Sequence, residues 1–178
     1  LSVEVRGKPG GGLTVQIIGN DIVPPLVSIT QPSDGLKTKE TLITVTGRAS
    51  DVTTSVSSVT VNGSPATLTG EAFEAKMTLV EGPNTITALA TDLVGNQAQV
   101  SITVTRDTTP PNVSVTSPSN LSTFNTNSIS VSGTVDDLEA TVTVNGLPAI
   151  VSGGAFSLTL DIGEGTRFIT AVASDPLG

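Results

Sequence analysis

An internal repeat constrains the fold of this 178-residue chain more than any other feature of its sequence. The segment DIVPPLVSITQPSDG, which begins at Asp21, matches DTTPPNVSVTSPSN, which begins at Asp107, so the two copies lie 86 positions apart. The same spacing relates TVTGRASD at residues 44–51 to SVSGTVDD at residues 130–137. Self-similarity at a fixed spacing is typical of chains built from consecutive copies of one structural unit.

The match continues after a deletion of three residues, which reduces the spacing to 83. VTVNGSPA at residues 59–66 then matches VTVNGLPA at 142–149, and EGPNTITALATD at 81–92 matches EGTRFITAVASD at 164–175. Chance similarity would not keep one register across so many blocks. We therefore treat the chain as two copies of one unit.

Short alternating segments in each copy predict β-strands. Alternation of apolar and polar residues is clear at residues 43–46 and 100–104. Asn-Gly pairs at 62–63 and 145–146 predict tight hairpin turns, because both central residues of such a turn need a positive φ. In the first copy we expect seven strands, at residues 26–30, 42–49, 57–61, 65–68, 72–79, 84–91 and 97–105. Seven short strands with closely spaced turns indicate a β-sandwich.

The motifs also carry a family resemblance. The order D-x-x-PP-x-V-x-I-x-x-P, V-x-G-x-x-x-D, VNG, G-x-F, EG-x-N-x-I and A-x-D-x-x-GN is similar to bacterial Ig-like repeats, in particular to modules related to glucodextranase domain B. The resemblance implies an all-β, elongated chain of tandem seven-stranded Ig-like β-sandwiches. It predicts repeat 1 at residues 21–106 and repeat 2 at residues 107–178, the latter without its last strand.

Residues 1–20 resemble the final hairpin of a preceding repeat, because residues 13–25 are similar to residues 100–111. Two interpretations are open. In the first, the sequence is a window on a longer tandem array. In the second, residues 1–20 are donor strands that complete the last sandwich of a neighbouring subunit and so build a polymer by β-augmentation.

Composition excludes several classes of function. The chain has no Cys, His, Trp or Tyr, so it lacks the imidazole base, the thiolate nucleophile and the usual zinc ligands. We therefore expect no enzymatic activity. Sixteen acidic against eight basic residues give a net charge of -8, which disfavours nucleic acid as a partner. No apolar run reaches the ~20 residues of a membrane span.

Aspartates recur at the predicted junction between repeats. Asp21, Asp51 and Asp92 lie in loops that should meet at the N-terminal pole of repeat 1, and the matching positions of repeat 2 are Asp107, Asp136 or Asp137, and Asp175. Such clusters suit Ca²⁺, which binds oxygen ligands, and bound calcium would stiffen the junctions. The alternative is that these aspartates only cap turns through hydrogen bonds to their own backbone.

These features together predict an extracellular or cell-surface structural module that forms a rod, stalk or filament. The expected partners are neighbouring copies or repeats of the same chain, arranged head to tail and joined by donor strands in the polymer interpretation. The alternative is an adhesin or other binding module, or a non-catalytic spacer attached to a secreted enzyme.

Overall fold

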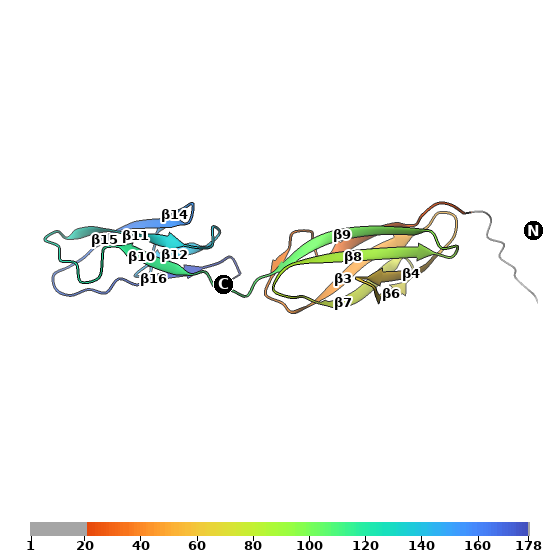
Figure 1. The fold of residues 1–178 in the computed structure, drawn as a ribbon, viewed down its shortest axis with the longest axis horizontal. Helices are drawn as coiled ribbons and strands as arrows, with labels where there is room; N and C mark the ends of the chain where they lie inside the picture. The colour runs from red at the N-terminus through yellow and green to blue at the C-terminus, as the bar shows by residue number, and fades with distance from the viewer. Residues whose placement is uncertain (1–20, 178) are drawn as a thin grey trace, which may run out of the picture. The chain divides into compact units, whose positions relative to one another are not determined.

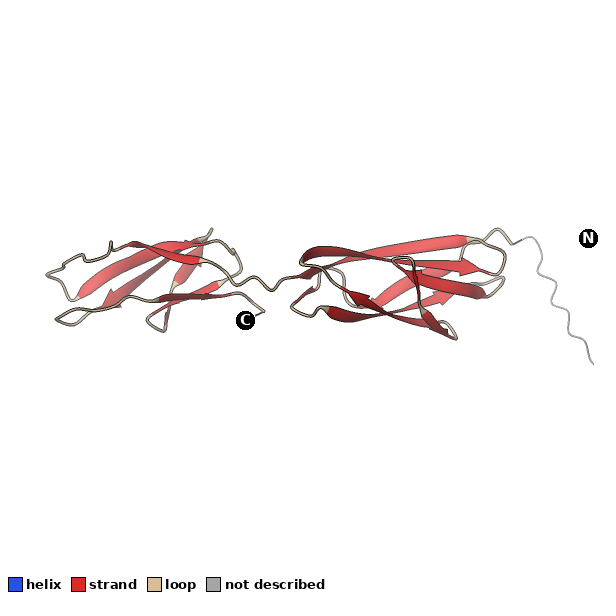
Figure 2. Cartoon of the chain, turned by 60° about the horizontal axis from the view of Figure 1, so that its bottom comes forward, coloured by secondary structure: helices blue, strands red, loops and turns tan. Residues whose placement is uncertain are grey.

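The computed structural model describes residues 21–177 (Figure 1, Figure 2). The chain divides into two compact units, one formed by residues up to 36 together with 40–105, and the other by residues 37–39 together with those from 106 onward. Within residues 21–177 there are strands, turns and loops but no helix, and so none that could cross a membrane. The hairpin predicted for residues 1–20 lies outside the described residues.

Repeat 1 forms two sheets with an apolar layer between them. Its strands are β1 (Leu26–Gln31), β2 (Lys37–Thr38), β3 (Leu42–Ser50), β4 (Val56–Val61), β5 (Ser64–Pro65), β6 (Thr67–Thr69), β7 (Ala72–Thr78), β8 (Gly82–Asp92) and β9 (Gln97–Arg106). One sheet has the order β1-β3-β7-β6 and the other has the order β2-β9-β8-β4-β5. Figure 1 shows β8 and β9 running side by side. The arrangement is the predicted β-sandwich.

The core of repeat 1 is built from small aliphatic side chains around one aromatic ring. Inward positions alternate with exposed ones along β8, as the period of two in a strand requires. The buried apolar residues are Val45, Ala49, Val59, Val61, Phe73, Leu79, Ile86, Ala88, Ala90 and Val104.

Two details of the strand prediction are wrong. The predicted strand at 65–68 is two strands in different sheets, since β5 pairs with β4 and β6 pairs with β7. The chain changes sheets at Ala66, whose N–H still bonds to the Val59 carbonyl. The second detail is β2, which was not predicted and which lies at the edge of the five-stranded sheet, beside β9. Repeat 1 therefore has nine strand segments rather than seven.

Repeat 2 follows the same plan over its described residues. Its strands are β10 (Val113–Ser117), β11 (Ser128–Val135), β12 (Thr141–Val144), β13 (Leu147–Pro148), β14 (Ile150–Ser152), β15 (Ala155–Asp161) and β16 (Ala171–Ser174). The sheet orders are β10-β11-β15-β14 and β13-β12-β16. The first order reproduces β1-β3-β7-β6 strand for strand. The second order matches the β5-β4-β8 part of the other sheet of repeat 1.

Equivalent residues adopt equivalent backbone conformations in the two repeats. Asn62 and Asn145 have φ of 47° and 49°, as the predicted Asn-Gly turns require. Each repeat also pairs a strand glycine with a buried phenylalanine, Gly47 with Phe73 and Gly133 with Phe156. A Cβ atom at either glycine would collide with that aromatic ring and with a backbone carbonyl of the neighbouring strand. The two glycines therefore make room for the largest side chains of the two cores.

Candidate metal centre

Three aspartates of repeat 1 come together from three separate segments of the chain. Asp21 precedes β1, Asp51 directly follows β3, and Asp92 is the last residue of β8. Each contributes one carboxylate oxygen to a group in which these oxygens all lie within 4.8 Å of one another. The sequence predicted that these three loops share one pole, and the structure brings all three carboxylates together there.

The cluster is largely shielded from water. Asp92 is 2% exposed and Asp21 is 8% exposed, while Asp51 is half-buried. Carboxylates are rarely buried to this extent unless they are paired with a cation or hydrogen-bonded. The partners of each oxygen therefore decide what the cluster can do.

The Oδ1 atom of each aspartate accepts hydrogen bonds from the backbone of its own loop. Val23 N–H donates to Asp21 Oδ1 over 2.9 Å, and the N–H groups of Thr53 and Thr54 donate to Asp51 Oδ1 over 2.9 and 2.6 Å. Three successive N–H groups, those of residues 94–96, donate to Asp92 Oδ1. Short aspartate side chains stabilise turns in this way. The turn-capping interpretation thus accounts for one oxygen of each carboxylate.

Asn96 connects two of the three segments. Its Nδ2 donates to Asp92 Oδ2 over 2.8 Å and to the backbone carbonyls of Asp21 and Val23 over 3.2 and 3.4 Å. The prediction omitted this residue, although the GN of the A-x-D-x-x-GN motif marks it in the sequence. Asn96 therefore holds the segment before β1 against the loop between β8 and β9.

Asp92 has a perturbed acidity. Burial raises the pKa of Asp92, but hydrogen bonds from the Asn96 side chain and from three backbone N–H groups of the same loop outweigh burial and hold that pKa below its usual value. Asp92 is therefore ionised at neutral pH despite its burial.

Two oxygens of the cluster have no hydrogen-bond partner. Asp21 Oδ2 and Asp51 Oδ2 are both buried from water and accept no hydrogen bond. Native proteins leave few buried polar atoms unsatisfied, so such atoms need a specific explanation. Turn capping does not supply one, because it uses only the Oδ1 atoms.

The predicted counterpart of this cluster in repeat 2 is not assembled. Among residues 21–177, the acidic residues within 4.8 Å of one another in a group of three or more are those of repeat 1 alone. Asp136 Oδ1 accepts from Asn112 N–H, and Asp137 Oδ1 accepts from Glu139 N–H. Asp107 and Asp175 accept from the N–H groups of residues 109 and 177. Asp107, Asp137 and Asp175 cap turns, whereas Asp136 links the end of β11 to the segment before β10. A calcium site at these residues stays a prediction.

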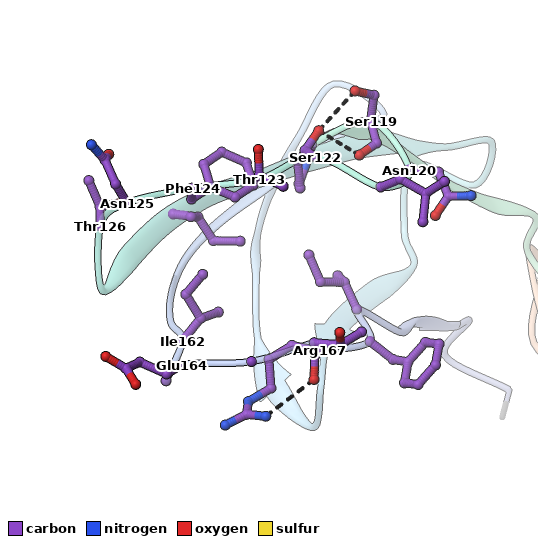
Figure 3. Close-up of a pocket in the computed structure, with 18 of the residues that line it drawn as sticks. Ser119, Asn120, Ser122, Thr123, Phe124, Asn125, Thr126, Ile162, Glu164 and Arg167 are labelled. Carbon is purple, nitrogen blue, oxygen red and sulfur yellow. Dashed lines mark hydrogen bonds between the residues drawn. The ribbon is translucent and has the colours of Figure 1, made fainter.

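Repeat 2 instead has a cleft of about 900 Å³, lined by residues 118–127 on one side and 162–169 on the other. Figure 3 shows Thr123 and Phe124 facing Ile162 and Arg167 across this opening. In repeat 1 the matching loop bonds to β9, since Gly35 N–H donates to the Thr103 carbonyl. The cleft therefore lies where repeat 1 places the contacts of its last strand.

Comparisons with known proteins agree with this fold. Residues 25–108 and 111–178 each match the family described as glucodextranase, domain B. Bacillopeptidase F of Bacillus subtilis (strain 168) is 32% identical over 154 residues, which are 84% of this chain and 11% of that protein. The chain thus spans about a tenth of the length of this relative.

Two solved structures align with most of the chain at low sequence identity. The fibronectin(III)-like modules of Clostridium thermocellum CbhA align over 85% of this chain and 87% of theirs, with 19% identity and a TM-score of 0.45. The N-terminal Ig1-2 module of the Drosophila receptor protein tyrosine phosphatase DLAR aligns over 88% and 93%, with 13% identity and a TM-score of 0.35.

The family match covers nearly all of the described residues and falls into two segments that correspond to the two repeats. The sheets, the repeated turns and the glycine–phenylalanine pairs give each repeat the same β-sandwich. The chain belongs to the glucodextranase domain B family of Ig-like modules and contains two of them in tandem.

Proposed function

We propose that this chain is a non-catalytic structural segment of an extracellular or cell-surface protein, in which tandem sandwiches act as a rod, stalk or filament that separates other parts. The observation that carries the proposal is that the side chains of residues 21–177 serve mainly to build and hold together the two sandwiches. Apolar residues fill the two cores, and polar side chains such as those of Asp92 and Asn62 cap turns or join neighbouring strands. A catalytic constellation would also have to do without His and Cys.

The comparisons favour one form of this role, a spacer attached to an enzyme. The matched family takes its name from one domain of glucodextranase, and the chain spans only 11% of Bacillopeptidase F. Both observations are typical of a module that accompanies larger parts of a protein. Fold alone does not specify function, so the role has to be tested in the protein that carries the repeats.

The test is to remove repeat 2 from that protein and measure the distance between fluorophores placed on either side of the array. We expect the distance to fall by at least about 25 Å, because the 8 residues of β11, the longest described strand of repeat 2, rise about 3.3 Å each. Replacing repeat 2 with a second copy of repeat 1 is the matched control and should restore the distance. An unchanged distance after deletion would refute the spacer.

The adhesin alternative predicts a different result in the same experiment. Specific binding to a glycan or a protein would be lost when repeat 2 is exchanged for repeat 1, although the distance is kept. A structural spacer tolerates this exchange without loss of function.

A second candidate role is polymerisation through a donor strand, and the state of the repeat 2 core favours it. Ile169, Ala171 and Ala173 are half-buried, and Ile169 lines the cleft. A strand like β9, supplied by another copy, would cover them by β-augmentation. Sedimentation of the 178-residue chain tests this role: concentration-dependent polymers that a peptide with the sequence of residues 97–106 disperses would support it. A monomer at all concentrations would exclude it.

A further inference from the structure

We propose that the carboxylates of Asp21, Asp51 and Asp92 form a calcium site that joins the segment entering repeat 1 to both of its sheets. This inference is independent of the spacer role, since it concerns an ion rather than the parts that the repeats separate. It begins from two observations: three carboxylate oxygens lie within 4.8 Å of one another, and two buried oxygens of the cluster accept no hydrogen bond.

The unsatisfied oxygens are the first step. Asp21 is more than nine-tenths buried, and its Oδ2 has neither water access nor a donor, as is also true of Asp51 Oδ2. The Oδ1 atoms are already held by backbone N–H groups, which orient the carboxylates before any ion binds. An ion that accepts electron pairs from the Oδ2 atoms would satisfy both of them.

Charge is the second step. Ionised carboxylates at this separation repel one another, and burial strengthens the repulsion because it removes the screening by water. No Lys or Arg side chain of residues 21–177 donates a hydrogen bond to Asp21 Oδ2 or Asp51 Oδ2. A divalent cation is therefore the partner whose charge fits the cluster.

The donor set selects the kind of cation. The candidate ligand atoms are carboxylate oxygens, and Asn96 Nδ2 donates both to Asp92 Oδ2 and to the backbone carbonyls of Asp21 and Val23, which brings these carbonyls near the cluster. Ca²⁺ accepts carboxylate and carbonyl oxygens in irregular geometry, whereas Mg²⁺ demands near-octahedral geometry and retains waters. Zinc prefers nitrogen and sulfur ligands, and the chain has no His or Cys.

The position of the site gives the ion a structural consequence. Asp51 directly follows β3 of one sheet, and Asp92 is the last residue of β8 in the other sheet. Asp21 lies on the segment that leads into β1. An ion held by all three would fasten that segment to both layers of the sandwich. Calcium would therefore order the N-terminal pole of repeat 1.

The experiment is a titration of the chelator-treated 178-residue chain with Ca²⁺, followed by calorimetry and native mass spectrometry. Sensitised lanthanide emission is unsuitable because the chain has no Trp or Tyr. We expect one bound ion per chain, and a rise of about 10 °C or more in the Tm of repeat 1 at a concentration 100-fold above Kd. Mg²⁺ at the same concentration should give a smaller rise.

Asp51→Asn is the test variant, because asparagine keeps the Oδ1 that caps the turn and replaces the charged carboxylate's Oδ2 with a neutral NH₂ group, which cannot bind a cation. Calcium affinity should fall at least about tenfold. Without calcium, the variant should melt at or above the temperature of the unmodified chain, because one repulsive charge is gone. If Asp51 only capped its turn, the substitution would not weaken calcium binding while leaving the calcium-free Tm unchanged or higher. Asp137→Asn, the matched variant in repeat 2, should leave affinity and stoichiometry unchanged.

Two outcomes would overturn the proposal. The first is an unchanged mass and Tm at millimolar Ca²⁺. The second is binding that Asp21→Asn and Asp51→Asn both leave intact, which would place the ion elsewhere. An equal response to Mg²⁺ and Ca²⁺ would refute the selectivity for calcium.

Discussion

The two repeats place the same residues in different environments. Ile86, Ala88 and Ala90 on β8 are fully buried, whereas their counterparts Ile169, Ala171 and Ala173 are half-buried. The side chains are identical, so their chemistry does not explain the difference. Repeat 1 contains β9 beside β8, and the positions that correspond to β9 in repeat 2 would follow Gly178. The last strand of this fold therefore covers part of the core as well as pairing with β8 in its sheet.

The opposite half of the core, which contains Phe73 or Phe156, is alike in both repeats. Phe73 and Phe156 are each 2% exposed and each lies opposite a glycine. This half depends on β3 and β7, or on β11 and β15, and not on the last strand. The different burial of residues 86–90 and 169–173 thus arises in the sheet that contains β8 or β16.

The largest effect is expected from removing the aromatic rings. Phe73→Ala and Phe156→Ala should each lower the free energy of unfolding of their own repeat by about 3–5 kcal/mol, because each leaves a cavity in a closed part of the core. Hydrogen exchange read by mass spectrometry reports the two repeats separately. A much smaller cost for Phe156 would show that the whole core of repeat 2 has relaxed, and would break the comparison.

Supplying the last strand should have the next largest effect. Appending a copy of residues 96–106 after Gly178 should stabilise repeat 2 by at least about 3 kcal/mol, the contribution of two fully buried aliphatic side chains. Slower exchange at residues 169–173 is the expected readout. The same residues in scrambled order are the control, and equal protection by both extensions would contradict the role given to β9.

The glycines opposite the rings should come next. Gly47→Ala and Gly133→Ala introduce a Cβ into the aromatic ring and into a backbone carbonyl. Each should cost about 1–3 kcal/mol, the usual range for overpacking. Denaturant unfolding of the two variants checks this, with Gly63→Ala as a strain control, because a Cβ there meets no atom within 4 Å. Equal losses of unfolding free energy at residues 47 and 133 would support the conclusion that this half of the core is packed in the same way in both repeats.

The smallest effect is expected at the hairpin turns. Asn62 bonds through its side chain to Thr87 N–H and the Thr85 carbonyl, and Asn145 bonds in the same way to Thr170 N–H and the Phe168 carbonyl. Replacing either with Ala should cost about 1–2 kcal/mol, from lost hydrogen bonds and a positive φ. Thermal unfolding measures both. A lower cost at Asn145 would mean that β16 is held less firmly than β8.

Much of the fold could be predicted because the same sequence patterns occur in both repeats, so a strand or turn predicted in one copy is supported by the other. The Asn-Gly turns and the strands at both ends of repeat 1 follow from patterns that occur twice. The two-residue β2 has no alternation of its own, and it forms only because β9 lies beside it. Ala66 has no signal for a change of sheet, since both of its neighbouring segments alternate normally.

The candidate site could be predicted only in part for a similar reason. Loop positions in a sandwich indicate that Asp21, Asp51 and Asp92 share a pole, but not which oxygens remain without a donor. The aspartates of repeat 2 have matching sequence positions, yet within residues 21–177 no three of them converge. Whether carboxylates converge depends on distances of a few ångströms, which a pattern of residues does not contain.

The paired glycine and phenylalanine have a consequence for how a tandem chain folds. Within one repeat the pair fixes the pairing register of β3 and β7, because sliding β3 along β7 by two residues would drive a Cβ into the ring. The other repeat has the same glycine–phenylalanine pair. The pair therefore does not distinguish a strand's own partner from the equivalent strand of the neighbouring repeat. Swapped pairing between adjacent units is a known failure of repeat proteins. A slowly resolving, cross-paired fraction during refolding of the full chain would be its signature.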